Sequence, residues 1–405
     1  MNYIRSLLVV RFFTMMAEQM MIFLVPFYVY KLTGSISASG LAFAIEFIPR
    51  IIGVAISPSV LNRWKEASAL KAIEALKWSI LVAYTLILMS PVDLNTALVF
   101  PLVAGLFGFF AELSFPILEK HLGYISDKHP DIRKDVVFSK QQSIDTVAMA
   151  LGPVLSALLV GYFSHLEMLE LFTLLQLAAL AILFSASWLA SPAHTEADNH
   201  SEDTPHASLL LGLKLMCKER SLVEVFITGF LLNLGLGILL LSSQDYLTIR
   251  LSVPGETFGV ILSVAGASCA ITLYCLNKIT QYVDLKTLSK VSALISATIL
   301  IVIGTTQHYY LYFALFVLYF VTDNIFAVYI RTLRSQLFNG KQLISVLGCM
   351  IVLLLMAFPC AGILAYFLKE KTITFALPII AVLVFITGLT FKGLNKNESS
   401  TSYIS

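Results

Sequence analysis

The sequence predicts an all-α membrane protein with about twelve transmembrane helices, arranged as two six-helix halves. The first observation behind this prediction is composition. Of the 405 residues, 58% are hydrophobic and only 13% are charged, whereas a soluble domain carries about 25% charged residues. The mean hydropathy is +0.84. Because too few charges remain to cover a globule of this size, most of the outer surface must face lipid.

The second observation is a series of long apolar segments separated by short polar loops. A bilayer core needs about 20 apolar residues per helix, whereas an outer-membrane barrel would show alternating segments of about ten residues. The segments are long and continuous, so helices are predicted. We expect them at residues 7–30, 38–61, 71–90, 96–118, 143–163, 168–190, 221–243, 257–279, 288–306, 309–330, 343–367 and 373–391.

The third observation is the distribution of the 27 lysines and arginines, which sets the orientation of a membrane protein. With the N-terminus in the cytoplasm, most of these residues fall in cytoplasmic segments. The predicted external loops contain only Lys31, Arg250, Lys369 and Lys371. We therefore expect cytoplasmic N- and C-termini, and the short loops are typical of a bacterial inner (cytoplasmic) membrane protein.

The longest polar stretch between predicted helices is the segment 191–220, which is rich in Ser, Thr, His and acidic residues. Such a composition is typical of a solvated linker. We therefore expect an N-terminal six-helix half at residues 1–190, a cytoplasmic linker at 191–220 and a C-terminal six-helix half at 221–405.

Short motifs connect the sequence to a known family. The segment Leu-Asn-Arg at 61–63 follows the second predicted helix, and Leu-Asn-Lys at 276–278 follows the eighth, which indicates an internal repeat. The segment Tyr-Lys-Leu-Thr-Gly-Ser at 30–35 resembles the first external loop of the major facilitator superfamily. In the loop after the second helix, Arg63 of the family's signature is present, but Asn62 stands where the family has an aspartate. The resemblance implies a substrate site between the two halves.

A further segment, Ala-Leu-Gly-Pro at 150–153, is similar to the antiporter signature in the fifth helix of that superfamily. The match consists of Gly152 and Pro153, with small residues in place of the other glycines. Small residues allow helices to approach closely, and proline bends a helix. The resemblance implies export, while ordinary tight packing explains the same residues equally well.

Ionisable side chains inside the predicted helices define the candidate site, because charges in a bilayer are costly and mark functional positions. The candidates for proton coupling or substrate binding are Glu18, Glu46, Arg50, Glu112, Asp145 and Asp323. The candidates for gating are Arg11, Arg63, Arg331 and Arg334. Asp145 opens the fifth helix, where a carboxylate is also favoured by the helix dipole.

Three patterns assign roles to the acidic candidates. Glu18 stands in the middle of the first helix, where a carboxylate can take up and release protons; a substrate contact or a structural hydrogen bond is the alternative. Glu46 and Arg50 are four residues apart and share one helix face, which predicts an ion pair. Glu112 and Asp323 stand at similar depth in the two halves, and each is expected to pair with an arginine.

Two iron-related branches of the superfamily resemble the sequence. The segment 40–50 is similar to the second helix of members associated with siderophores. The segment Glu-Gln-Met at 18–20 stands where ferroportins have Asp-Arg-Met, which implies Glu18 and Asp145 as metal ligands. The second half departs from ferroportins, because Asp245 stands in the region of their cysteine and the eleventh helix has no histidine.

Proton-coupled export of a small organic solute, with a siderophore as the favoured substrate, is therefore the predicted function. The alternatives are ferrous-iron efflux, ferric-siderophore uptake, efflux of a drug or metabolite, and a non-transporting membrane sensor. No nucleophile–base pair, phosphate loop or metal motif predicts an enzyme or a cofactor. The net charge of +2 gives no reason to expect nucleic acid. The expected partners are the substrate, protons and the lipid bilayer, with the chain acting as a monomer.

Overall fold

The computed structural model describes residues 2–61, 66–91, 95–128, 134–189, 209–254, 257–338, 340–369 and 375–390. The described chain is helical almost throughout and has no strand within these ranges. The predicted all-α membrane fold is confirmed. Each predicted span coincides with one helix, except that the span at 343–367 falls on two elements, α12 and α13. Most helices run a few residues beyond the predicted bounds because hydropathy detects only the part of a helix that lies in hydrocarbon.

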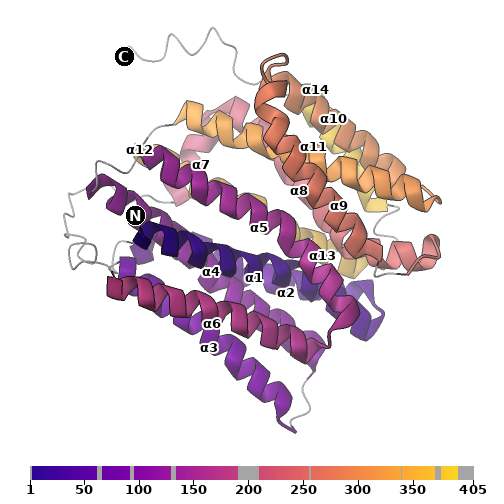
Figure 1. The fold of residues 1–405 in the computed structure, drawn as a ribbon. Helices are drawn as coiled ribbons and strands as arrows, with labels where there is room; N and C mark the ends of the chain where they lie inside the picture. Colours follow the sequence, from indigo (N-terminus) through magenta and orange to yellow (C-terminus); the bar gives the residue numbers. More distant parts are fainter. Residues whose placement is uncertain are drawn as a thin grey trace, which may run out of the picture.

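The helices form two groups in chain order (Figure 1). The first group is α1 (Asn2–Thr33), α2 (Ile36–Leu61), α3 (Glu66–Met89), α4 (Thr96–Lys128), α5 (Lys134–Tyr162) and α6 (His165–Leu189). After α7 (Leu209–Lys218), the second group is α8 (Arg220–Asp245) with its π-helical extension (Tyr246–Arg250), α9 (Thr257–Ile279), α10 (Leu285–Ile303), α11 (Tyr309–Leu337), α12 (Gly340–Leu355), α13 (Ala357–Leu368) and α14 (Leu377–Thr390).

Ten helices of the described chain are long and apolar enough to cross a membrane. In two cases neighbouring elements join into one span, α8 with its π-helical extension and α12 with α13. The other two predicted spans coincide with α5, which is not among these ten helices, and with the shorter apolar α14. In Figure 1, α1–α6 occupy the lower part of the view, α8–α11 and α14 the upper part, and α5 lies along the boundary, where it contacts α9.

The segment between the two groups is partly described. Residues 190–208 lie outside the described ranges, so the predicted bounds of the halves and of the linker stay a prediction. α7 lies inside the predicted linker and packs against α12, because Gly212 brings its backbone next to Ser345. The Gly212 and Met216 positions of α7 are buried.

The eleventh span, predicted as one continuous helix at 343–367, has a local irregularity at Met356, where the backbone stays in the helical region. α12 ends at Leu355, and α13 begins at Ala357 after a turn at Met356. The cause is Pro359, which has no backbone N–H and whose ring collides with the carbonyl group four residues earlier. That carbonyl belongs to Leu355, the last residue of α12.

Glycines set the distance between α2 and α4. A Cβ atom at Gly53 would lie 2.5 Å from the backbone oxygen of Phe109, and one at Gly105 would lie 3.0 Å from the backbone oxygen of Glu46. The two helices therefore touch along their backbones. This close packing presses the Glu46 and Arg50 face of α2 against α4.

The two groups of helices meet closely at the end where α1 finishes, which the loop charges predict to be external. A Cβ atom at Gly40 of α2 would lie 2.6 Å from the backbone oxygen of Gly362 of α13. Two hydrogen bonds cross between the groups at this end. The Tyr30 hydroxyl donates to Asp245 over 2.7 Å, and the Ser37 hydroxyl donates to the Tyr366 carbonyl over 3.1 Å.

Candidate functional site

Arg50 of α2 is the centre of a buried charge cluster. The residue is 0% exposed. Its Nη1 donates to Glu18 Oε1 of α1 over 2.7 Å, and its Nη2 donates to Glu46 Oε1 over 3.2 Å. The ion pair predicted between residues 46 and 50 is therefore present, and Glu18 joins it from a neighbouring helix.

A second ion pair joins α1 to α5. Arg11 Nε lies 2.7 Å from Asp145 Oδ1, and both residues are buried. The Arg11 guanidinium also lies over the Phe115 ring of α4, with 4.9 Å between Cζ and the ring centroid. Because α5 begins at Lys134, Asp145 lies about three turns inside the helix, so the predicted helix-start role is wrong. Its side chain instead joins α5 to α1.

Glu112 of α4 lies between the two ion pairs. It interacts electrostatically with Glu18, Arg50 and Arg11. Arg11 and Arg50 therefore lie near four acidic residues, which are Glu18, Glu46, Glu112 and Asp145. The Oε2 atom of Glu46 is buried and has no hydrogen-bond partner among the described residues. The cluster therefore contains more carboxylates than its arginines can neutralise, which suits the uptake of protons or of a positively charged group.

Asp323 lies apart from this cluster, in the middle of α11. The side chain is buried, and no ion pair of the described residues includes it. Its neighbours are Cys269 of α9 and Tyr319 of α11. The Tyr319 hydroxyl donates to the Leu232 carbonyl of α8 over 2.7 Å, which fixes α11 against α8. The pairing with an arginine that the sequence suggests for Asp323 is absent from the described structure.

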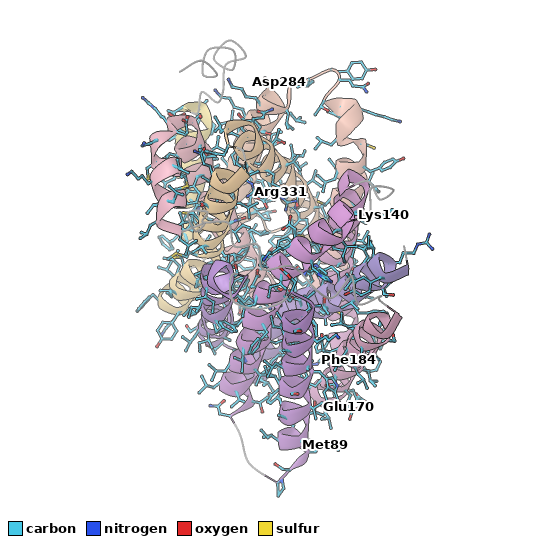
Figure 2. The ribbon with its side chains drawn as sticks, turned by 90° about the vertical axis from the view of Figure 1, so that its left-hand side faces the viewer. Met89, Lys140, Glu170, Phe184, Asp284 and Arg331 are labelled. Carbon is cyan, nitrogen blue, oxygen red and sulfur yellow. The ribbon has the colours of Figure 1, made fainter. Side chains whose placement is uncertain are left out.

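The gating candidates Arg331 and Arg334 lie in the last turns of α11, towards the end of the protein where α1 begins (Figure 2). Figure 2 views this end and shows Arg331 near the boundary between the two groups of helices. Arg331 interacts electrostatically with Asp145, and Arg334 with Glu119 of α4. No ion pair of the described residues joins either arginine to Glu112 or Asp323, whereas Glu112 interacts electrostatically with Arg11 and Arg50. Arg63 lies outside the described residues.

Gly152 brings α5 against α1 at the level of the cluster. A Cβ atom at Gly152 would lie 2.5 Å from Gln19 Cβ, next to Glu18. Pro153 follows inside α5 without ending the helix. The close contact accounts for the glycine of the antiporter-like segment as a packing residue.

Sequence reasoning missed a third buried ion pair. Lys77 Nζ of α3 lies 3.0 Å from Glu74 Oε2, and Lys77 is 0% exposed. Gln176 of α6 donates to the same carboxylate oxygen over 2.5 Å, and Lys77 lies over the Phe107 ring. The signal was available, because Glu74 and Lys77 are three residues apart in an apolar segment, a spacing that places them on one face.

A pocket lies between the two groups of helices, where the family resemblance implies a substrate site, but its lining residues were not predicted. Its walls come from α1, α2 and α5 on one side and from α8 and α9 on the other. Most lining side chains are apolar, including Phe23, Phe43 and Phe258. Gln244 of α8 contributes an amide whose Oε1 atom has no hydrogen-bond partner among the described residues. A glutamine near the end of an apolar segment gives no signal of such a role.

The residues that resemble ferroportin ligands do not form an open metal site. Glu18 is bonded to Arg50 and Asp145 to Arg11. Among the described residues, no group of three or more His, Cys, Asp or Glu side chains is arranged to hold a metal ion. The ferrous-iron alternative therefore has no assembled ligand set in this state.

Gly108 of α4 packs directly against the Arg50 side chain, and substitution of Gly108 by alanine tests this contact. A Cβ atom there would overlap the guanidinium group and Cγ of Arg50. Because Arg50 is fully buried, we expect Gly108→Ala to cost about 1–3 kcal/mol of stability through overpacking and to lower the melting temperature of the detergent-solubilised protein. Gly348→Ala is the matched control, because its Cβ atom would meet only Leu209 Cδ2, at 3.8 Å. Equal melting temperatures for the two variants would contradict the expectation.

Comparison with known proteins identifies the family to which this chain belongs. The sequence matches the Major Facilitator Superfamily model over residues 7–342, and no curated protein sequence matches the chain. The structure is similar to that of the nucleoside transporter NupG, with a TM-score of 0.70, 15% sequence identity, and coverage of 96% of this chain and 98% of that chain. A variant of the peptide transporter POT gives a TM-score of 0.73 at 13% identity, covering 96% of this chain and 93% of that chain.

A bacterial homologue of the iron transporter ferroportin, in an outward-facing state, has a TM-score of 0.65 at 14% identity, with coverage of 96% of this chain and 99% of that chain. At these identities the structural likeness shows the fold alone. The family match covers most of the sequence and agrees with the helical architecture, and it points to a transporter rather than an enzyme. The chain belongs to the Major Facilitator Superfamily.

Proposed function

We propose that this secondary transporter exports a small organic solute in exchange for protons, and that the solute is a siderophore. It acts as a monomer in a bacterial inner membrane, with both termini in the cytoplasm. The observation that carries the proposal is the Glu18–Arg50–Glu46 cluster. It places an excess of buried carboxylate next to the pocket between the two groups of helices.

The geometry suggests how protons and solute could be coupled. Ile22 lines the pocket, and Glu18 precedes it by four residues of α1, a rise of about 6 Å. A proton on Glu18 weakens its bond to Arg50, which keeps its second partner Glu46. Protonation of one side chain therefore changes the charge beside the pocket and the link between α1 and α2, as coupling requires.

The choice of solute rests on the resemblance of segment 40–50 to siderophore-associated members and on the antiporter-like Gly152-Pro153 segment. Ferrous-iron efflux is a second candidate, since a ferroportin homologue is among the similar structures. Against it, both candidate ligands in the first half are bonded to arginines. An organic solute therefore fits the described residues better than a metal ion.

The test is an iron-starvation experiment in the host. Deletion of the gene is expected to remove iron-chelating activity from the spent medium, because the chelator stays in the cells. The intact gene should restore secretion, as should a Glu170→Gln control, which changes an exposed carboxylate of α6 (Figure 2). The Glu18→Gln variant should not. Unchanged extracellular chelator after deletion would reject the siderophore proposal and direct attention to iron efflux or ferric-siderophore uptake.

A further inference from the structure

The pocket between the two groups of helices has a composition that restricts its ligand. Four phenylalanines line it, Phe23, Phe27, Phe43 and Phe258, and aromatic walls favour flat apolar groups. The Ser156 hydroxyl at its edge already donates to the Met20 carbonyl over 3.0 Å. This leaves the Gln244 amide oxygen as a polar atom of the lining that lacks a partner among the described residues.

The charges around the pocket are unbalanced. Each buried cation of the described chain has an acidic partner: Arg11 with Asp145, Lys77 with Glu74, and Arg50 with either Glu18 or Glu46. Arg50 can neutralise one of its two acids, and Glu112 adds a further carboxylate near Arg50 and Arg11, so the first group of helices holds more buried carboxylates than arginines to neutralise them. Asp323 adds a carboxylate in the other group, where the described residues offer it no ion pair. A bilayer interior tolerates such charge only when a cation or a proton balances it.

Glu18 and Asp323 do not line the pocket, but each is connected to it by a helix that does. Glu18 lies about one helical turn from Ile22, which lines the pocket. Asp323 neighbours Cys269 of α9, and Cys269 follows the lining residue Leu262 by about two turns of that helix. Carboxylates of both groups of helices therefore stand about one to two helical turns beyond the aromatic lining.

From this arrangement we propose that the pocket, whose cavity volume is about 20 Å³ in this state, opens to bind an aromatic solute that carries a positive charge. The aromatic part packs against the phenylalanines, the cationic group interacts with Glu18 and Asp323, and Gln244 Oε1 accepts a hydrogen bond from the solute. Arg50 stays on Glu46 while Glu18 turns to the ligand. The inference rests on the proposed transport function. For a siderophore, it specifies an aromatic, amine-bearing chelator rather than a polycarboxylate, whose charge the excess carboxylates would repel.

The test is equilibrium binding to the purified full-length protein, which needs no transport. Tritiated tetraphenylphosphonium is the probe, and 4-phenylbutylammonium and 4-phenylbutyrate compete with it as ligands of one skeleton and opposite charge. We expect saturable binding of the probe, and displacement by the ammonium compound at concentrations at least about tenfold lower than by the carboxylate, because like charges exclude the wrong partner. Comparable displacement by both compounds, a preference for the carboxylate, or no saturable binding of the probe would overturn the proposal.

Variants locate the interaction. Asp323→Asn and Glu18→Gln should each weaken probe binding by about tenfold, whereas Glu170→Gln, on the exposed face of α6, should leave it unchanged. Gln244→Glu should strengthen binding of the cation, because it adds a carboxylate to the pocket wall. A Gln244→Glu variant that folds normally and binds the probe no better than the original chain would contradict the placement of the site.

The binding result and the secretion result can be told apart. If gene deletion abolishes chelator secretion but the purified protein shows no preference for the cationic competitor, the proposed export function is supported and the proposed class of ligand is rejected. A clear cation preference with unchanged secretion would support the ligand class and reject the siderophore as its substrate.

Discussion

Replacement of Arg50 by methionine is expected to destabilise the protein by about 3–5 kcal/mol, because it leaves buried carboxylates without their cation. Methionine fills a similar volume, so the loss reports charge rather than packing. Arg50 is 0% exposed and donates to both Glu18 and Glu46. The measurement is the unfolding midpoint of the detergent-solubilised protein.

Two comparisons make this result specific to the cluster. Arg331→Met removes an exposed arginine of α11 that interacts electrostatically with Asp145 but forms no ion pair among the described residues, so it should change stability by no more than about 1 kcal/mol. The triple variant Arg50→Met, Glu18→Gln, Glu46→Gln should recover most of the lost stability, since a buried ion cluster replaced as a whole is often tolerated. A similar midpoint for Arg50→Met and Arg331→Met would show that the cluster contributes little.

Glu18→Gln is expected to abolish uphill transport while it leaves exchange of solute for solute largely intact. The amide can still accept the hydrogen bond from Arg50 that the carboxylate accepts over 2.7 Å, but it cannot take up and release a proton. Uphill movement depends on that proton, whereas exchange needs only the movement of the loaded protein.

The measurement uses proteoliposomes and the chelator recovered from the host medium, with and without a pH gradient. Glu170→Gln should behave as the original chain does. Full uphill transport by the Glu18→Gln variant would show that proton coupling does not need the Glu18 carboxylate. Loss of both uphill transport and exchange would assign Glu18 to substrate binding or to the structure instead.

The fold could be predicted from the sequence because the signals for it are local. A span is recognised by its own hydropathy, so α1 was predicted at residues 7–30 and found at Asn2–Thr33. The ion pair between residues 46 and 50 is likewise a property of one helix face. The irregularity at Met356 was missed although Pro359 is visible in the sequence, because a proline bends some spans and interrupts others.

The candidate site could be predicted only in part, since its contacts join helices that are distant in sequence. Arg11 and Asp145 are 134 residues apart, and their pairing depends on how α1 and α5 are rotated against each other. Arg50 was assigned to Glu46 alone because the approach of α1 cannot be read from α2. In the sequence, Gly108 cannot be distinguished from other small residues of apolar helices, and only the packing of α4 on α2 shows that it contacts the Arg50 side chain.

The irregularity at Met356 separates two kinds of packing along one membrane span. On one side of it, α13 lies against α2, where Gly40 and Gly362 bring the two backbones together. On the other side, α12 lies against α7, where Gly212 comes next to Ser345. A single span therefore contacts the first group of helices through one part and the short helix α7 through the other. A larger residue at Gly40 or at Gly212 would disturb opposite ends of the same span.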